Sequence, residues 1–505
     1  MVLVLMHTMD VKGQCKFARS FTTDDLLQSP EARDKFMDLV SYWEGQFHQE
    51  GVGFDAPSGY TYDGHGIDDA TGGMADPLHY WSAPSKESIH LMALALALDG
   101  NPHARVFVSP SNPQGYLERA LGILEKKMDT YDNWVYKYPG FGGYFPWVYV
   151  TAQGVNPTPD WMDRVPSLDN GEFIWAIYAV IQTLQGQNST LAGNLATRYQ
   201  KYFNLLAKNG ITIFYDGNGN VRAESKILNV SALPTPSNYV NNAPNYFLDD
   251  PYEGEMFCFF LDLFGDWSSP DEKEKIWVNK RKKLQSVDYP TPNGPITVQR
   301  GYWFSAHEQW KYLELPYLEV PINRRIFLNG ERARTWNSVL KNIPGLFASV
   351  SNYTVSGPVT QYISGVGIPE ISFQPVVTQD LLTPYGAFPV MLADLPTGLA
   401  WYNSMLVGSR MQGPYGSTES TSASGMYIAP VLTWDSKITS IIGMYGGVSS
   451  IVKKKLEADQ KYSRFYEVVD REWTMAFPTI EGESLEFKAP QIQVPAPVPD
   501  FTLCQ

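Results

Sequence analysis

The sequence predicts a mainly α protein, folded as a single (α/α)6 barrel in which an inner ring of helices is wrapped by an outer ring. Two observations favour this fold. Helices that are apolar on every side alternate along the chain with helices that carry one apolar stripe, and no strong break divides residues 60–470. A length of 505 residues alone would instead suggest about three domains of ~150 residues each.

The first kind of helix has no polar face, so we expect it to be buried in the inner ring. It is predicted in three segments, each built around an apolar run: residues 87–98 around Leu-Met-Ala-Leu-Ala-Leu-Ala-Leu, residues 172–186 around Phe-Ile-Trp-Ala-Ile-Tyr-Ala-Val-Ile, and residues 253–264 around Met-Phe-Cys-Phe-Phe-Leu.

The second kind of helix follows each buried one and is predicted over residues 114–128, 190–208 and 269–284. In the first of these, Leu117 and Leu121 lie on one face, and in the last Ser269 and Pro270 form an N-cap followed by a proline at the first helical position. A helix with one apolar stripe lies on a surface. The sequence shows three consecutive pairs of a buried and a striped helix, and six such pairs would fit the length of the chain.

The chain is predicted to consist of the barrel and two segments that flank it. Residues 1–60 are interpreted as an N-terminal extension that packs on it, residues 61–485 as the barrel itself, and residues 486–505 as an extended Pro-rich tail. Residues 352–430 are rich in Gly, Pro, Ser and Tyr. They hide the helices of the second half and are expected to be strands or long loops around a cleft.

Composition excludes several classes of partner. The 39 Lys and Arg against 53 Asp and Glu give a net charge of -14, which disfavours nucleic acid. No apolar stretch reaches the ~20 residues that span a bilayer, so we expect no membrane partner. The three cysteines, Cys15, Cys258 and Cys504, leave at most one disulfide, and no motif suggests a metal or a cofactor. We expect a monomer.

The aromatic content is high, with 14 Trp, 30 Tyr and 25 Phe, and such residues either fill a core or line a groove. Acidic and amide residues stand at the starts of the buried helices, as in Ser85-Lys86-Glu87, Leu168-Asp169-Asn170-Gly171-Glu172 and Asp249-Asp250-Pro251-Tyr252-Glu253. Because inner helices of a toroid run in the same direction, these groups would converge at one mouth of the barrel.

Three carboxyl groups are candidates for chemistry there. Asp169 and Asp435 each precede or open a buried helix, so each is either an N-cap or part of a site. Glu253 differs, because neighbouring aspartates are available for capping its helix. The helix dipole lowers the pKa of Glu253 and desolvation raises it, and the sequence leaves the sign open. Paired carboxyl groups among aromatic residues are typical of glycoside hydrolysis.

Several segments resemble the endo-β-1,2-glucanases of glycoside hydrolase family 162, a group related to family 144. The resembling segments are Tyr252-Glu253-Gly254-Glu255-Met256, Gly301-Tyr302-Trp303-Phe304-Ser305-Ala306-His307-Glu308-Gln309-Trp310, Leu328-Asn329-Gly330-Glu331-Arg332-Ala333-Arg334-Thr335-Trp336-Asn337, and Gln412-Gly413-Pro414-Tyr415-Gly416 leading into Trp434-Asp435-Ser436.

The resemblance implies an (α/α)6 barrel that hydrolyses linear β-1,2-glucan to sophoro-oligosaccharides with inversion. It implies that Glu253 is the general acid and that an Asp, here matched to Asp435, is a base that activates water through a substrate hydroxyl. Glu255 competes for the role of the acid and Glu419 for that of the base. Secreted members carry a signal peptide and this chain shows none, so both secretion and a cytoplasmic location stay open.

The expected substrate-binding residues are gathered near the motifs: Asp169, Asn170, Trp175, His307, Gln309, Trp310, Arg332, Gln412 and Tyr415. His307, Gln309 and Trp310 either contact glucosyl units or form an ordinary helix start, and Arg332 either holds a catalytic carboxylate or makes a structural ion pair. The alternatives for function are a glycosidase or transglycosylase of another β-glucan linkage, and a glycan-binding relative without activity.

Overall fold

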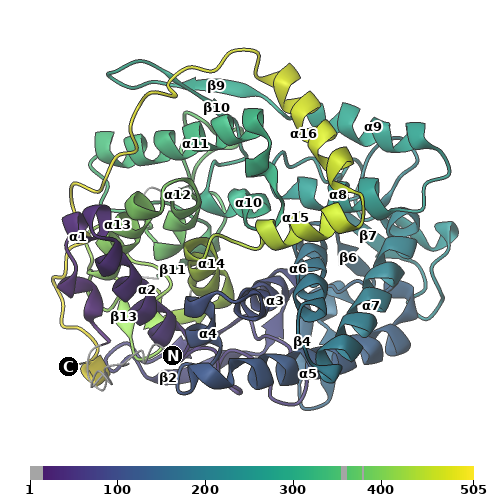
Figure 1. Cartoon of the computed structure of the whole chain (residues 1–505), viewed down its shortest axis with the longest axis horizontal. Coiled ribbons are helices and arrows are strands. Elements are labelled where there is room, and N and C mark those ends of the chain that lie inside the picture. Colours follow the sequence, from purple (N-terminus) through teal and green to yellow (C-terminus); the bar gives the residue numbers. More distant parts are fainter. Residues whose placement is uncertain (1–14, 354–360, 378–379, 505) are drawn as a thin grey trace.

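The computed structural model describes residues 15–353, 361–377 and 380–504, so the apolar run at the start of the chain lies outside the described residues. Within these ranges the chain forms sixteen α-helices and fifteen short strands. The helices build a two-layered ring, which Figure 1 shows in a view along the shortest axis of the molecule. The prediction of a mainly α barrel is therefore confirmed.

Six helices form the inner ring: α3 (Pro84–Asp99), α6 (Leu168–Gln185), α8 (Gly254–Phe264), α10 (Lys311–Glu314), α12 (Phe388–Ala393) and α14 (Trp434–Met444). α6 packs on α3 and α8, α12 packs on α10 and α14, and α14 packs on α3. An ion pair of 2.9 Å between Lys311 and Glu255 links α10 to α8. The three buried helices predicted from the sequence are α3, α6 and α8.

The outer helices and those between the rings are α1 (Thr23–Gln28), α2 (Pro30–Glu44), α4 (Pro102–Val108), α5 (Tyr116–Lys137), α7 (Thr190–Phe214), α9 (Pro270–Arg281), α11 (Pro321–Leu340), α13 (Leu395–Leu406), α15 (Ser449–Ala458) and α16 (Tyr462–Ala476). The predicted striped helices are α5, α7 and α9. Each covers its inner partner with its apolar face, as α7 does on α6 and α9 on α8.

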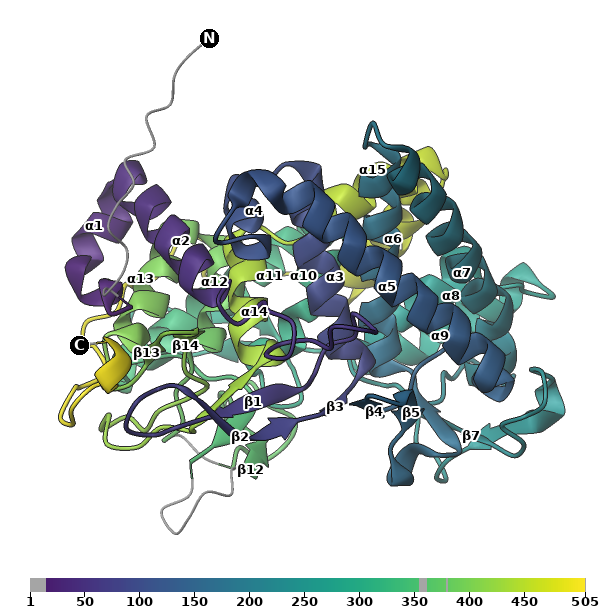
Figure 2. The same cartoon turned by 90° about the horizontal axis from the view of Figure 1, so that it is seen from below.

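The strands form small antiparallel sheets: β15-β1-β2, β3-β4-β5, β6-β7-β8, β9-β10, β11-β12 and β13-β14. Their bounds are β1 Gly64–Ile67, β2 Met74–His79, β3 Trp81–Ser82, β4 Val148–Thr151, β5 Gly154–Pro157, β6 Arg164–Pro166, β7 Glu224–Ile227, β8 Tyr239–Asn241, β9 Ser286–Tyr289, β10 Ile296–Gln299, β11 Val350–Asn352, β12 Gln361–Ile363, β13 Gln412–Gly413, β14 Gly416–Ser417 and β15 Val431–Thr433. Figure 2 shows β1–β5, β7 and β12 on one side of the helices, with α15 on the opposite side.

The strand side is also the side where the inner helices begin, because β3 leads into α3, β6 into α6 and β15 into α14. β1 pairs with β15 in the register Gly64↔Thr433, which brings the start of the barrel beside its last inner helix. A Cβ on Gly64 would lie 2.2 Å from the carbonyl oxygen of Leu432, so only glycine permits this approach. The predicted gathering of helix N-termini at one mouth is confirmed.

The two ends of the described part of the chain meet on the outside of the barrel. α1 packs on α13, and α2 packs on α4 and α14. The Pro-rich tail is extended up to Thr502 and runs along α13, where the Val494 N–H donates to the Ser404 carbonyl. A disulfide joins Cys15 to Cys504, with a Cα–Cα distance of 5.4 Å, and Cys258 is a buried free thiol. The division of the chain at residues 60 and 485 stays a prediction.

Among the described helices, none combines the length and the apolar character that a bilayer crossing demands.

Candidate active site

A cleft of about 770 Å³ opens on the strand side of the barrel, where the inner helices begin. Its walls come from β1–β3, from the first turns of α3, α6 and α14, and from the segments around Glu253 and Trp310. The carboxyl groups that line it are those of Asp63, Asp76, Asp169, Glu172, Glu253, Glu419 and Asp435. The single Lys or Arg among the described residues that line it is Lys86.

Glu253 stands at the N-cap position of α8 and makes no capping bond. The cap is supplied by Asp250, whose Oδ1 accepts from the backbone N–H of Tyr252 at 2.8 Å and of Gly254 at 3.2 Å. Only 7% of Glu253 is exposed, and the residue lines the cleft. The expectation that a neighbouring aspartate leaves Glu253 free of the capping role is therefore confirmed.

The pKa of Glu253 lies well above its usual value. Burial is the largest cause, and the negative charges of Asp250, Glu308, Asp169 and Asp435 add to it. Desolvation thus outweighs the helix dipole. The sign of the pKa shift of Glu253, which the sequence leaves open, is upward. A raised pKa is what a carboxyl group needs in order to act as a general acid.

Asp435 lies in the first turn of α14 and is not its cap. Thr433 caps this helix, with its Oγ1 accepting from the Ser436 N–H at 3.3 Å. Oδ2 of Asp435 lies 2.7 Å from Nζ of Lys86, whereas Oδ1 is buried and has no hydrogen-bond partner among the described residues. Burial raises the pKa of Asp435, and the Lys86 charge opposes that rise.

Aromatic rings form the walls between these two carboxyl groups: Trp81, Trp147, Trp310, Tyr362 and Tyr385. The indole N–H of Trp310 donates to the hydroxyl of Tyr385 at 2.7 Å. Trp81 stacks on His79 at 4.5 Å, and Lys86 lies over the ring of Trp147 at 4.6 Å. Flat apolar faces beside polar groups suit a ligand that is apolar on its ring faces and polar at its edges, as a pyranose is.

Three further acidic residues differ in their position relative to the cleft. Asp169 lines the cleft and does not cap α6, and burial raises its pKa to about 6. Glu419 also lines the cleft, but both its oxygens are engaged, by the Ser351 N–H at 3.0 Å and the Thr433 hydroxyl at 2.7 Å. Glu255 accepts from Lys311 and Tyr317 inside the barrel. It belongs to the core and not to the cleft.

His307 lines the cleft together with Trp310. The Nδ1 atom of His307 lies 2.9 Å from the Ser349 hydroxyl, which fixes the ring. Gln309, from the same segment, is buried and does not reach the lining. Of the predicted polar–aromatic patch, two members therefore face the cleft and Gln309 packs behind them.

The structure places two other predicted contacts in the core. Asn170 uses its amide to bind backbone, accepting from the Phe145 N–H and donating to the carbonyls of Phe145 and Pro166. Trp175 is fully buried and donates to the Met256 carbonyl at 2.9 Å. Both follow Asp169 on α6, and the turn of the helix directs them away from the cleft.

Three more predicted contacts lie outside the cleft, near the chain ends. Arg332 donates to the Leu485 carbonyl and lies over the ring of Phe487, so it contacts the start of the tail. Among the described residues it makes no ion pair and does not contact a carboxylate of the cleft. Gln412 accepts from the Ala18 N–H at 3.0 Å. Tyr415 lies in the β13–β14 turn and packs half-buried against the core. Gln412 and Tyr415 are predicted substrate contacts, but their loop forms the β13–β14 hairpin beside the N-terminal segment.

Sequence reasoning missed several lining residues, among them Asp63, Trp147, Glu172 and Tyr362. A signal existed for Lys86 and Glu172, since both stand in the first turns of helices that are otherwise apolar. For Asp63 and Tyr362 no local signal exists, because Asp63, before β1, and Tyr362, on β12, come from distant parts of the chain. No group of described residues is arranged to hold a metal ion.

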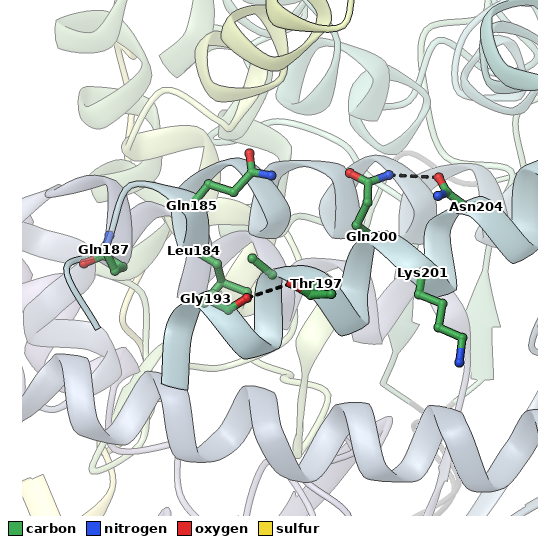
Figure 3. Close-up of a pocket in the computed structure, with 9 residues that line it drawn as sticks. Leu184, Gln185, Gln187, Gly193, Thr197, Gln200, Lys201 and Asn204 are labelled. Carbon is green, nitrogen blue, oxygen red and sulfur yellow. Dashed lines mark hydrogen bonds between the residues drawn. The ribbon is translucent and has the colours of Figure 1, made fainter. Parts of the chain in front are cut away.

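A second hollow, of about 600 Å³, lies at the other end of α6, between that helix and α7 (Figure 3). Amide and hydroxyl side chains dominate it, and Gln200 and Thr197 already bond within α7, to Asn204 and to the Gly193 carbonyl. Its described lining includes no carboxyl group and no aromatic ring. The carboxylate cleft is therefore the candidate active site.

The chain is similar over most of its length to known proteins. A family model described as endo-beta-1,2-glucanase SGL matches residues 60–505. An endo-beta-1,2-glucanase from Talaromyces funiculosus, solved with sophorose, is 42% identical and superposes with a TM-score of 0.94, covering 98% of this chain and 100% of that one. The same enzyme was solved with beta-1,2-glucan as a mutant in which a glutamate is replaced by glutamine.

A more distant structure shares the fold. The endo-beta-1,2-glucanase from Chitinophaga pinensis, solved with sophorotriose and glucose, is 14% identical and superposes with a TM-score of 0.59 over 84% of this chain and 97% of that one. No curated protein matches the chain.

Proposed function

The chain belongs to the endo-β-1,2-glucanases of glycoside hydrolase family 162, and from this premise we propose that its cleft cleaves linear β-1,2-glucan internally, with Glu253 as general acid and Asp435 as general base. The products are sophoro-oligosaccharides. The chain is a glycoside hydrolase. The proposal for its substrate-binding and catalytic residues is based on the contacts that these residues make in the cleft.

One observation carries the assignment of roles: the two carboxyl groups have opposite electrostatic surroundings. Glu253 lies among carboxyl groups, which favours its protonated form. Asp435 has the ammonium group of Lys86 at 2.7 Å, which favours its ionised form. Two carboxyl groups held in different protonation states are what acid–base hydrolysis of a glycosidic bond requires.

The proposed reaction follows from these states. Glu253 donates its proton to the glycosidic oxygen as the bond from that oxygen to the anomeric carbon breaks. A water molecule attacks the same carbon from the opposite face of the ring. Its proton reaches Oδ1 of Asp435, directly or through a hydroxyl group of the substrate, so the new reducing end is first an α-anomer. The Glu-to-Gln substitution in the glucan-bound relative keeps the shape of an acid while removing its proton, in line with a glutamic acid donor.

The experiment that tests the function uses the purified chain with linear β-1,2-glucan, laminarin and cellulose in parallel. Chromatography should find short oligosaccharides from β-1,2-glucan alone, and proton NMR during the first minutes should find the α-anomer. No products from β-1,2-glucan would refute the proposal. Longer chains with retained linkages would identify a transglycosylase instead, and binding without products would identify a glycan-binding protein.

A further inference from the structure

Lys86 occupies a position where helix stability argues against a cation. It lies in the first turn of α3, where the helix dipole favours negative charge, and only 6% of it is exposed. A buried lysine costs free energy unless it is paired. Its side chain is nevertheless held in one place, over the ring of Trp147 and 3.4 Å from the Ser85 hydroxyl. The compensating partners must therefore be the carboxylates that it faces.

Those partners are unequal. Nζ of Lys86 lies 2.7 Å from Oδ2 of Asp435 and 3.8 Å from Oδ1 of Asp63. Burial alone would lower the pKa of Lys86, but the charges of Asp435, Asp63 and Asp169 together raise it, so the ammonium form persists. Among the described residues no Lys or Arg pairs with Glu253, whose basic neighbour is His307 at 3.9 Å. Lys86, the single Lys or Arg in the described cleft lining, therefore pairs with Asp435 and not with Glu253.

We propose that Lys86 is the positioning residue of Asp435: its ammonium group binds Oδ2 and keeps the carboxylate charged, which leaves Oδ1 to accept the proton from water. This inference rests on the proposed function, in which Asp435 is the base. Lys86 touches neither the glycosidic oxygen nor the attacking water in this scheme. It acts through Asp435 alone.

The other charges around Asp435 all have the opposite effect. They are the carboxyl groups of Asp63 before β1, Asp169 and Glu172 on α6, Glu253 before α8 and Glu419 before β15, and the phenols Tyr362 and Tyr385 lie in the same electrostatic neighbourhood. Lys437, further along α14, is already paired with Glu44 of α2. Loss of Lys86 would therefore leave Asp435 among acidic groups without a cation in contact.

The test is the pH dependence of kcat on linear β-1,2-glucan for Lys86→Met and Lys86→Arg. Asp435 must be ionised to act, and removing the cation raises its pKa, so the acidic limb of the Lys86→Met profile should move to higher pH by about 1–3 units. KM should change little. Lys86→Arg restores the positive charge, so its acidic limb should lie close to the pH of the wild-type limb.

Lys127→Met is the matched control for removing a buried lysine. Lys127 pairs with Glu87 at 2.6 Å between α5 and α3 and does not line the cleft. This variant should lose stability but keep the acidic limb in place. An unmoved limb in Lys86→Met, or an equal displacement in Lys127→Met, would overturn the inference.

Asp63→Asn provides a second measurement if Lys86→Met fails to fold. Asp63 is partly exposed, and its charge raises the pKa of Asp435. Neutralising it should move the acidic limb to lower pH, and a limb that stays or moves upward would contradict the inference. Asp435→Asn separates a failure of the proposed function from a failure of this inference. If Asp435→Asn has normal activity, Asp435 is not the base, and both are overturned. If Asp435→Asn is inactive but the acidic limb of the Lys86→Met profile does not move, only the role of Lys86 is overturned.

Discussion

Nε2 of His307 lies 3.9 Å from Oε1 of Glu253, and the two side chains do not form an ion pair at neutral pH. Burial, aided by the charge of Arg334, lowers the pKa of His307 to about 3, so the ring is uncharged. Glu253 therefore faces a neutral neighbour, which does not oppose the rise of its pKa. The pair explains how a carboxyl group can stay a donor although a histidine stands beside it.

Glu253→Gln should lower kcat on β-1,2-glucan by about 10²–10⁴-fold, because the amide has no acidic proton to donate. Binding of sophorose, measured by calorimetry, should change little, since the amide has the shape of the carboxyl group. The matched control is Glu255→Gln, two residues away. It leaves Lys311 buried without its partner, so it should cost about 3–5 kcal/mol of stability while the folded fraction keeps its activity. Equal kinetic losses in both variants would contradict the assignment.

Asp435→Asn should also lower kcat by about 10²–10⁴-fold, because an amide cannot take the proton of the attacking water. The release of reducing ends from β-1,2-glucan measures this. Glu419→Gln is the comparison, because Glu419 lines the same cleft but has both oxygens engaged by Ser351 and Thr433. If Glu419→Gln were the more damaging of the two, the base would have to be reassigned.

Trp310→Phe should raise KM for β-1,2-glucan by about tenfold. The change removes the N–H that orients Tyr385 and shortens the aromatic wall, and the loss of one such hydrogen bond is worth about 0.5–1.5 kcal/mol. Trp175→Phe removes a similar bond in the core, to the Met256 carbonyl. That variant should lower the melting temperature and leave KM unchanged, and the reverse pattern would place Trp175 at the substrate.

Glu314→Gln should make stability less dependent on pH. Glu314 is fully buried on α10, neither of its oxygens has a partner among the described residues, and burial raises its pKa well above the usual value. The folded protein therefore holds this proton above pH ~4.5, where the unfolded chain releases it, so stability is full below that pH and falls as pH rises through the folded pKa.

Urea unfolding at pH 5 and pH 8 measures this effect. The wild type should lose up to about 1.4 kcal/mol per pH unit through Glu314, and the variant should not. Glu457→Gln, at an exposed position, should leave the difference between the two pH values as it is in the wild type. A variant that matched the wild type at both pH values would show that Glu314 does not couple folding to protons.

Cys15→Ser and Cys504→Ser should each lower stability by about 2–4 kcal/mol, because the disulfide restricts the unfolded chain. The double variant should be no less stable than either single one. Reduction of the wild type should reproduce their melting temperature, while the same reductant should not affect the variants. A reduced wild type that melted unchanged would mean that the bond contributes nothing.

The sequence alone predicts the helices in which the hydrophobic pattern extends over several turns. α3, α6 and α8 could be predicted because each wraps apolar residues around several turns. α10 and α12 could not, since Lys311–Glu314 and Phe388–Ala393 are too short to display a helical period. The two proposed catalytic groups were found because they stand at helix starts, where a buried carboxyl group is conspicuous.

The rest of the cleft depends on contacts between distant segments. Asp63 lies beside the start of α14 because β1 pairs with β15, more than 350 residues later, and no local pattern encodes that pairing. The opposite error came from Gln412 and Tyr415. Both are predicted substrate contacts, but these residues pack near the N-terminal segment, which sequence spacing does not reveal.

The meeting of Cys15 and Cys504 makes the described chain a closed loop in space, with 5.4 Å between the Cα atoms of its ends. Circular permutation becomes a practical route for this fold, since a short peptide linker can replace the bond and new ends can be cut elsewhere. The exposed turn around Asn188, between α6 and α7, offers such a point at the far end of α6 from the cleft. An enzyme opened there would present its new termini away from a passing glucan chain.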